Sequence, residues 1–181
     1  MKPFLLVKLG LLPAFLFWGL AGAGHGRSGL TIAALGGALL LVLNRLRHLS
    51  RPMETTFAVF ALVAVVAEPL GLVTVHQTVA ASFALLGLTA LVGCARRRPW
   101  TSDYSAASFA GASATPLFLA INLALSLLWG VIFLALAGLV AVEAAPRWAS
   151  LVTGFGALVS VFGPKLLIRF ALGHAVRARE P

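Results

Sequence analysis

The residue best suited to chemistry in this sequence is a carboxylate that lies within an apolar segment. Glu68 falls in the apolar run from 56 to 75 and is followed by Pro69. Counted from Thr56, a helix rising 1.5 Å per residue places it about 18 Å along the run, beyond the midplane. An ionisable side chain is costly in hydrocarbon, which makes it a candidate for an ion or proton path. The alternatives are a carboxylate that reaches the outer headgroups or hydrogen-bonds a neighbouring helix.

Polar side chains also share one face of the apolar run from 115 to 142. Asn122, Ser126 and Trp129 are separated by four and then three residues, which places them on the same side of a helix. Such amides and hydroxyls most often hydrogen-bond another helix. Together with Glu68 they are also the residues that would line a transport path.

Residues that bind metals or haem are sparse. Cys94 is the only cysteine, so an intrachain disulfide and a paired-thiol metal site are excluded. The histidines, His25, His48, His76 and His174, all lie near the ends of apolar runs, whereas a membrane haem needs two that face each other across helices. The sequence also lacks a phosphate-binding loop, a nucleophile elbow and a His-Glu-x-x-His pattern. We therefore predict no enzymatic activity and no cofactor.

A basic and aromatic corner begins at residue 96. Arginines attract anionic headgroups, and Trp and Tyr favour the membrane interface. The corner is expected to be either an interfacial anchor or a docking site for a protein partner. A similar basic-Pro-acidic sequence occurs at Arg51–Pro52–Met53–Glu54. The residues of the later corner are Arg96, Arg97, Arg98, Trp100, Asp103 and Tyr104.

Composition places these residues in a membrane protein. Of the 181 residues, 60% are hydrophobic and only 10% are charged, whereas soluble domains are about 45–50% apolar and about 25% charged. Strands are not expected, because an open sheet cannot leave its edges in lipid. We predict an all-α, polytopic protein with one transmembrane domain over 1–181 and about six membrane-spanning helices. The six apolar runs are roughly 4–22, 28–44, 56–75, 77–94, 115–142 and 148–171.

The charge distribution predicts the orientation. The net charge is +9, and its basic residues cluster at both termini and after the second and fourth runs. Because cytoplasmic loops are enriched in Lys and Arg, both termini and these corners are expected in the cytoplasm.

The sequence shows no surface of interleaved basic and aromatic residues that is large enough to bind nucleic acid. The first run resembles a signal peptide, but we expect an uncleaved span. A re-entrant pair formed by runs three and four would keep the same charge alternation.

The layout resembles that of the bacterial intracellular septation protein A family, the inner membrane-spanning YciB-like proteins. The resemblance covers nearly the whole chain and implies a multi-pass protein of the bacterial inner membrane. It further implies a role in cell envelope maintenance and cell division through protein partners, with no catalytic residues. The features that carry it are Pro13, the basic corners, Arg98–Pro99, Asn122, Trp129, Phe133, Trp148 and Phe155–Gly156.

Two other functions remain open at this point. A small transporter or channel would use Glu68, Asn122 and Ser126 as its path. A cofactor-free accessory subunit of a respiratory or photosynthetic complex would use its helix surfaces for assembly. The expected partners are anionic lipid headgroups, other membrane proteins and a second copy of this chain.

Overall fold

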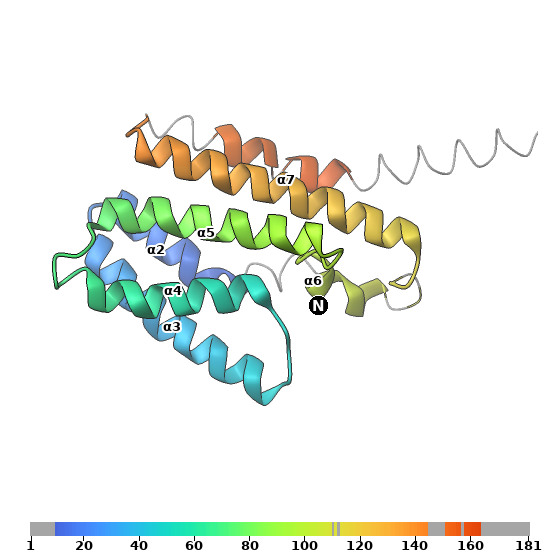
Figure 1. The fold of residues 1–181 in the computed structure, drawn as a ribbon, viewed down its shortest axis with the longest axis horizontal. Coiled ribbons are helices and arrows are strands. Elements are labelled where there is room, and N and C mark those ends of the chain that lie inside the picture. Colours follow the sequence, from blue (N-terminus) through green and yellow to red (C-terminus); the bar gives the residue numbers. More distant parts are fainter. Residues whose placement is uncertain (1–9, 110, 112, 145–150, 157, 164–181) are drawn as a thin grey trace, which may run out of the picture.

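The computed structural model describes residues 10–109, 111, 113–144, 151–156 and 158–163, and these residues form helices and no strand (Figure 1). The predicted all-α class is therefore confirmed for this part of the chain. A further helix covers 151–156 and 158–163. The other elements are α2 (Leu12–Gly22), α3 (Gly26–Leu46), α4 (Pro52–Ala67), α5 (Val75–Ala95), α6 (Ser102–Ser105), the 3-10 helix η1 (Ala106–Phe109) and α7 (Pro116–Ala141).

Three of these helices are long and apolar enough to cross a membrane. They are α3, α5 and α7, with 21, 21 and 26 residues. Helix α4 has 16 residues, so at 1.5 Å per residue it reaches about 24 Å, short of the roughly 30 Å of hydrocarbon in a bilayer. The three long helices indicate a membrane protein.

The third apolar run ends earlier than predicted. The expected helix over 56–75 is wrong at its end, because α4 stops at Ala67 and residues 68–74 form a connection. The Leu72 amide donates to the Ala67 carbonyl at 3.1 Å, and Gly71 has a φ of 71°. A turn of this kind needs a residue in the left-handed region, which glycine adopts without a steric penalty.

Local sequence explains where the next helices begin. Thr74 caps α5 through its hydroxyl, which accepts from the Gln77 amide, while the Gln77 side chain accepts from the Thr74 amide. This reciprocal capping box satisfies two amides that a helix start leaves free. The Thr115 hydroxyl caps α7 by accepting from the Phe118 amide at 3.2 Å, and Pro116 occupies the first turn, where its missing N–H is harmless.

The helices form two closely packed groups that meet along a seam. Helices α2, α3 and α4 form one group, and α5 packs along α7 in the other (Figure 1). Close approach within the first group depends on Gly37, where an added Cβ would lie 2.9 Å from the Ala58 Cα. Across the seam, the Trp18 ring stacks on Phe83 at 4.3 Å and its Nε1 donates to Ser82 at 2.9 Å. Helices α4 and α5 meet less extensively than the helices within either group.

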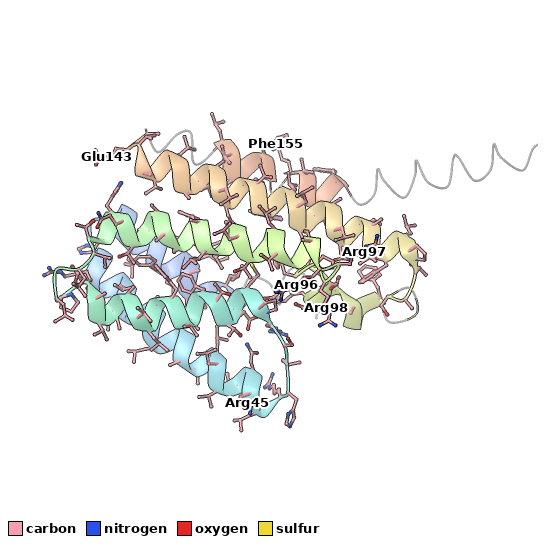
Figure 2. All side chains as sticks on the ribbon, in the orientation of Figure 1. Arg45, Arg96, Arg97, Arg98, Glu143 and Phe155 are labelled. Atoms are coloured by element: carbon pink, nitrogen blue, oxygen red, sulfur yellow. The ribbon has the colours of Figure 1, made fainter. Side chains whose placement is uncertain are left out.

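The two basic corners lie toward the same end of the bundle. Arg45 lies in the last turn of α3, and Arg96, Arg97 and Arg98 follow α5, while Glu143 lies at the opposite end (Figure 2). We call the end that carries these arginines the basic end. The connections 23–25 and 68–74 lie at the other end (Figure 1).

Candidate functional site

A buried carboxylate at the basic end organises the main polar cluster. Glu54 lies in the first turn of α4 and is only 2% exposed. Its Oε2 accepts from Asn44 Nδ2 at 2.6 Å, and its Oε1 accepts from Arg51 Nη1 at 3.0 Å and from the Tyr104 hydroxyl at 3.0 Å. Three separate parts of the chain, α3, the start of α4 and α6, therefore converge on one carboxylate.

The charge of Glu54 is compensated locally. A buried carboxylate is costly unless it is paired and hydrogen-bonded, and the Arg51 guanidinium supplies the opposite charge. That guanidinium also lies over the Tyr104 ring, 5.0 Å from its centroid, in the geometry of a cation–π contact. Burial raises the pKa of Tyr104 above its ordinary value, and the charge of the adjacent Glu54 carboxylate is the second cause of this increase. The phenol consequently stays protonated and remains a donor to Glu54.

The aromatic residues of the corner lie inside the protein. We expected Trp100 and Tyr104 to contact a partner or lipid, but they are 4% and 2% exposed and pack edge to face, with centroids 5.9 Å apart. Their burial removes them from any direct contact surface. The reason is tertiary: the segment after α5 folds back against α4, so both rings enter the core cluster.

The three arginines remain at the surface. Arg96, Arg97 and Arg98 are exposed and form no ion pair with any residue that the structure describes. The Arg98 amide donates to the Gly93 carbonyl at 2.8 Å, and Arg97 has a φ of 53°. Together, this hydrogen bond and the left-handed backbone of Arg97 end α5 in a tight turn. An added Cβ at Gly93 would lie 2.9 Å from the Arg98 carbonyl oxygen. The turn thus requires glycine at this position.

Asp103 lies between the buried and the exposed parts of the corner. Burial raises its pKa to about 6, an effect that Arg51 opposes and Glu54 reinforces. Within the described part of the chain it makes no ion pair.

Asn122 and Ser126 attach the corner to α7 instead of lining a path. Both are buried. The Ser126 hydroxyl lies 3.0 Å from the Thr101 hydroxyl, and Ser105 Oγ donates to Asn122 Oδ1 at 3.0 Å. These contacts match the helix-packing role that such residues usually have. Trp129, predicted on the same face, donates instead to Ser160 on the last described helix at 2.8 Å.

Glu68 lies away from this cluster, at the opposite end of the bundle. It is the C-cap of α4, so its predicted depth beyond the midplane of a longer helix is wrong. Its Oε1 accepts from Arg27 Nε at 2.8 Å, where the two side chains are 11% and 80% exposed. Glu68 is therefore far from Asn122 and Ser126, and the three residues do not form one site.

Glu54 is the central residue that the sequence did not single out. Its only signal was the resemblance of the two corners, each with an arginine, a proline and a nearby acid. In the structure the two corners meet, because Tyr104 of the later one bonds Glu54 of the earlier one. The cluster presents no group of three or more His, Cys, Asp or Glu side chains able to hold a metal among the described residues.

The chemistry available to this cluster is structural and electrostatic. Glu54 has its oxygens occupied by three protein donors, while Arg51 Nε and Trp100 Nε1 are buried and have no hydrogen-bond partner among the described residues. The carboxylate is thus committed to holding the corner in place, and the surface arginines are the groups left to bind another molecule. No family model, curated protein or solved structure matches this chain.

Proposed function

We propose that this chain is a non-catalytic, multi-pass protein of the bacterial inner membrane that supports the cell envelope or division machinery by binding membrane partners. Its contact is the surface of the arginine corner, Arg96, Arg97 and Arg98. The partner presents an acidic cytoplasmic segment, because three adjacent guanidinium groups favour carboxylates or phosphates. The resemblance to the septation protein A family gives this proposal its biological setting.

The observation that supports the proposal most is the firm mounting of three arginines that form no ion pair with any described residue. The corner is anchored at Tyr104 by Glu54 and at Thr101 by Ser126, while the three arginine side chains point outward (Figure 2). Preorganised groups lose less conformational freedom on binding than groups on a mobile loop. A positive surface that is held in place and has no acidic partner among the described residues is therefore suited to recognition of an acidic partner protein.

The proposed topology has six spans, with both termini and the basic end in the cytoplasm. Three helices of sufficient length and apolarity support part of it, and the common position of the basic corners agrees with the positive-inside tendency. In this arrangement Arg45, Arg47 and the arginine corner meet the anionic cytoplasmic leaflet, which attracts basic segments near the membrane surface.

The proposal is tested by recovery of partners from native membranes after cross-linking. A variant with Arg96, Arg97 and Arg98 all changed to Ala should recover its cross-linked partners several times less efficiently than wild type. The matched control changes Arg45 and Arg47, which are also exposed at the basic end, to Ala and should retain them. Equal recovery by wild type and the corner variant would count against the proposal.

The other two functions are distinguished by the same preparation. A transport path through Glu68, Asn122 and Ser126 has no common site among the described residues, so Glu68→Gln in liposomes should leave any flux unchanged. An accessory role in a respiratory or photosynthetic complex predicts that the corner recovers subunits of that complex. Identification of the recovered proteins by mass spectrometry separates that role from an envelope or division role.

A further inference from the structure

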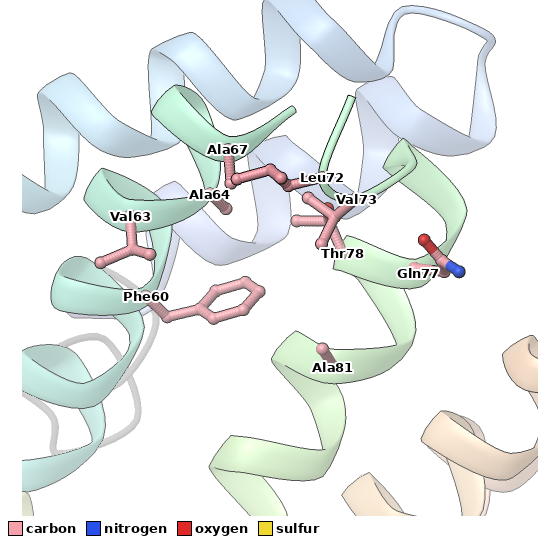
Figure 3. A pocket seen from close by; sticks show the side chains of 9 residues that line it. All are labelled: Phe60, Val63, Ala64, Ala67, Leu72, Val73, Gln77, Thr78 and Ala81. Carbon is pink, nitrogen blue, oxygen red and sulfur yellow. The ribbon is translucent and has the colours of Figure 1, made fainter. Parts of the chain in front are cut away.

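A hollow lies in the seam between the two helix groups, at the end opposite the arginine corner. It has a volume of about 310 Å³ and lies between the last two turns of α4 and the first turns of α5 (Figure 3). The connection after α4 covers one end of it. Its lining residues are Phe60, Val63, Ala64, Ala67, Leu72, Val73, Gln77, Thr78 and Ala81.

The lining offers carbon atoms almost exclusively. The Thr78 hydroxyl donates to the Thr74 carbonyl at 2.8 Å, and Gln77 Oε1 accepts from the Thr74 amide at 2.9 Å. One polar atom of each of these two residues is thus engaged in the cap of α5, and the other seven lining residues are aliphatic or aromatic. A polar or charged occupant would lose its hydrogen bonds to water without replacement. The lining therefore favours an apolar occupant.

The shape of the hollow favours a narrow, flexible chain. Alanines on both walls, Ala64 and Ala67 on α4 and Ala81 on α5, keep the helices from filling the space, and the Phe60 ring closes its deep end (Figure 3). From Ala67 to Phe60 the helix extends about 10 Å at 1.5 Å per residue. An apolar cavity of roughly 150 Å³ already accepts a benzene ring, so this larger hollow accommodates a stretch of alkyl chain.

The entrance faces the side of the bundle. Val63, Leu72 and Ala81 are exposed, and α5 is one of the helices long and apolar enough to cross a membrane. In the proposed topology this side of α5 faces the lipid. Leu72 and Val73 cover the end next to the connection, so a chain enters laterally from the leaflet and does not need to bring its headgroup in.

We propose that this hollow, the α4–α5 groove, binds an acyl chain of a membrane phospholipid. The lipid fills the part of the seam where α4 and α5 do not pack, and it complements the contacts of Trp18 and Tyr104 that join the two groups elsewhere. The ion pair of Arg27 with Glu68 helps to hold the connection that covers the groove. This site depends on the membrane setting and not on the function of the arginine corner.

The test uses the full-length protein in nanodiscs that contain a phospholipid with a photoreactive diazirine in its acyl chain. After photolysis, mass spectrometry should find labelling concentrated in residues 60–67 and 72–81. Ala81→Phe fills the groove from an exposed position and should reduce that labelling severalfold. The control Ala124→Phe places the same ring at an exposed site on α7 and should leave it unchanged.

Three results would overturn the proposal. One is labelling spread evenly over all exposed helix faces, and another is labelling of the groove that persists in Ala81→Phe. The third is a cross-link between two copies through 60–67 or 72–81, which would make the groove a dimer contact. If Ala81→Phe does not purify as a folded protein, Ala81→Leu gives a smaller obstruction and should reduce labelling by a smaller factor. Partner recovery through the arginine corner is unaffected in every case.

Discussion

Tyr104 donates its phenolic hydrogen to the Glu54 carboxylate at 3.0 Å, across 50 residues of sequence. Both side chains are almost fully buried. This bond joins the segment after α5 to the first turn of α4, and so connects the two helix groups at the basic end. The position of the exposed arginines depends on it, because Arg96, Arg97 and Arg98 lie between α5 and the buried Trp100 and Tyr104.

Removal of the Tyr104 hydroxyl should weaken the folded protein. Tyr104→Phe retains the ring but leaves a buried carboxylate oxygen with one donor fewer, for which we expect a loss of about 1–3 kcal/mol. The loss is measured as a lower midpoint in thermal unfolding of the purified protein in detergent. Thr55→Val, which removes an exposed hydroxyl next to Glu54, should leave the midpoint nearly unchanged. Identical midpoints for wild type and Tyr104→Phe would show that the bond is not formed.

The two ion pairs should differ strongly in their contribution to stability. Glu54→Gln leaves the largely buried Arg51 without its counter-charge, and loss of one partner from a buried pair costs about 3 kcal/mol or more. Glu68→Gln removes the partner of a largely exposed arginine, which costs about 1 kcal/mol or less. Unfolding of both variants under the same denaturing conditions gives the comparison. A larger loss for Glu68→Gln would contradict the burial described here.

Asp103 should introduce a pH dependence of stability. Its pKa rises from 3.8 to about 6 on folding, chiefly through burial, so the folded state binds the proton more tightly than the unfolded state. The contribution of Asp103 therefore favours folding at low pH and is lost as the pH increases through this window. The difference in unfolding midpoint between wild type and Asp103→Asn should change between pH 4 and pH 6. A constant difference across that range would contradict the shift.

Two glycines in apolar helices should respond in opposite ways to an added methyl group. Gly93→Ala places a Cβ 2.9 Å from the Arg98 backbone oxygen, whereas Gly138 has nothing within 4 Å of the same position. Gly93→Ala should therefore destabilise the protein and reduce cross-linking through the arginine corner. Gly138→Ala should be neutral or stabilise by up to about 1 kcal/mol, since alanine is the better helix former. Unfolding midpoints of the two variants measure this difference, and equal effects would show that the turn after α5 tolerates a side chain.

Cysteine accessibility tests the arrangement of the ends. In a Cys94→Ala background, His48→Cys and Arg97→Cys should react with a membrane-impermeant thiol reagent from the same side of the membrane. Leu70→Cys, in the exposed connection after α4, should react from the other side. Intact cells and inverted membrane vesicles present the two sides separately. Labelling of positions 48 and 97 from opposite sides would exclude the proposed topology.

Sequence reasoning was most successful where a property depends on composition along the chain. Apolar runs predict helices because a chain surrounded by lipid must satisfy its own backbone hydrogen bonds, and the described part of the protein is helical. The prediction that Asn122 and Ser126 share one face of a helix followed from periodicity alone, and the structure shows that both are buried. Helix ends were harder to locate, as Glu68 illustrates, because an apolar composition continues through the connection after α4.

The sequence by itself therefore determined the helical class, the apolar exterior and the clustering of arginines between the apolar runs, since each follows from local residue type and spacing. Only the tertiary structure decided that Trp100 and Tyr104 are buried, that Glu54 anchors Tyr104 and that Glu68 pairs with Arg27 at the far end. These relationships join residues 41 to 50 positions apart. They arise from how helices pack on one another, and a linear pattern of residue types carries no information about which distant faces meet.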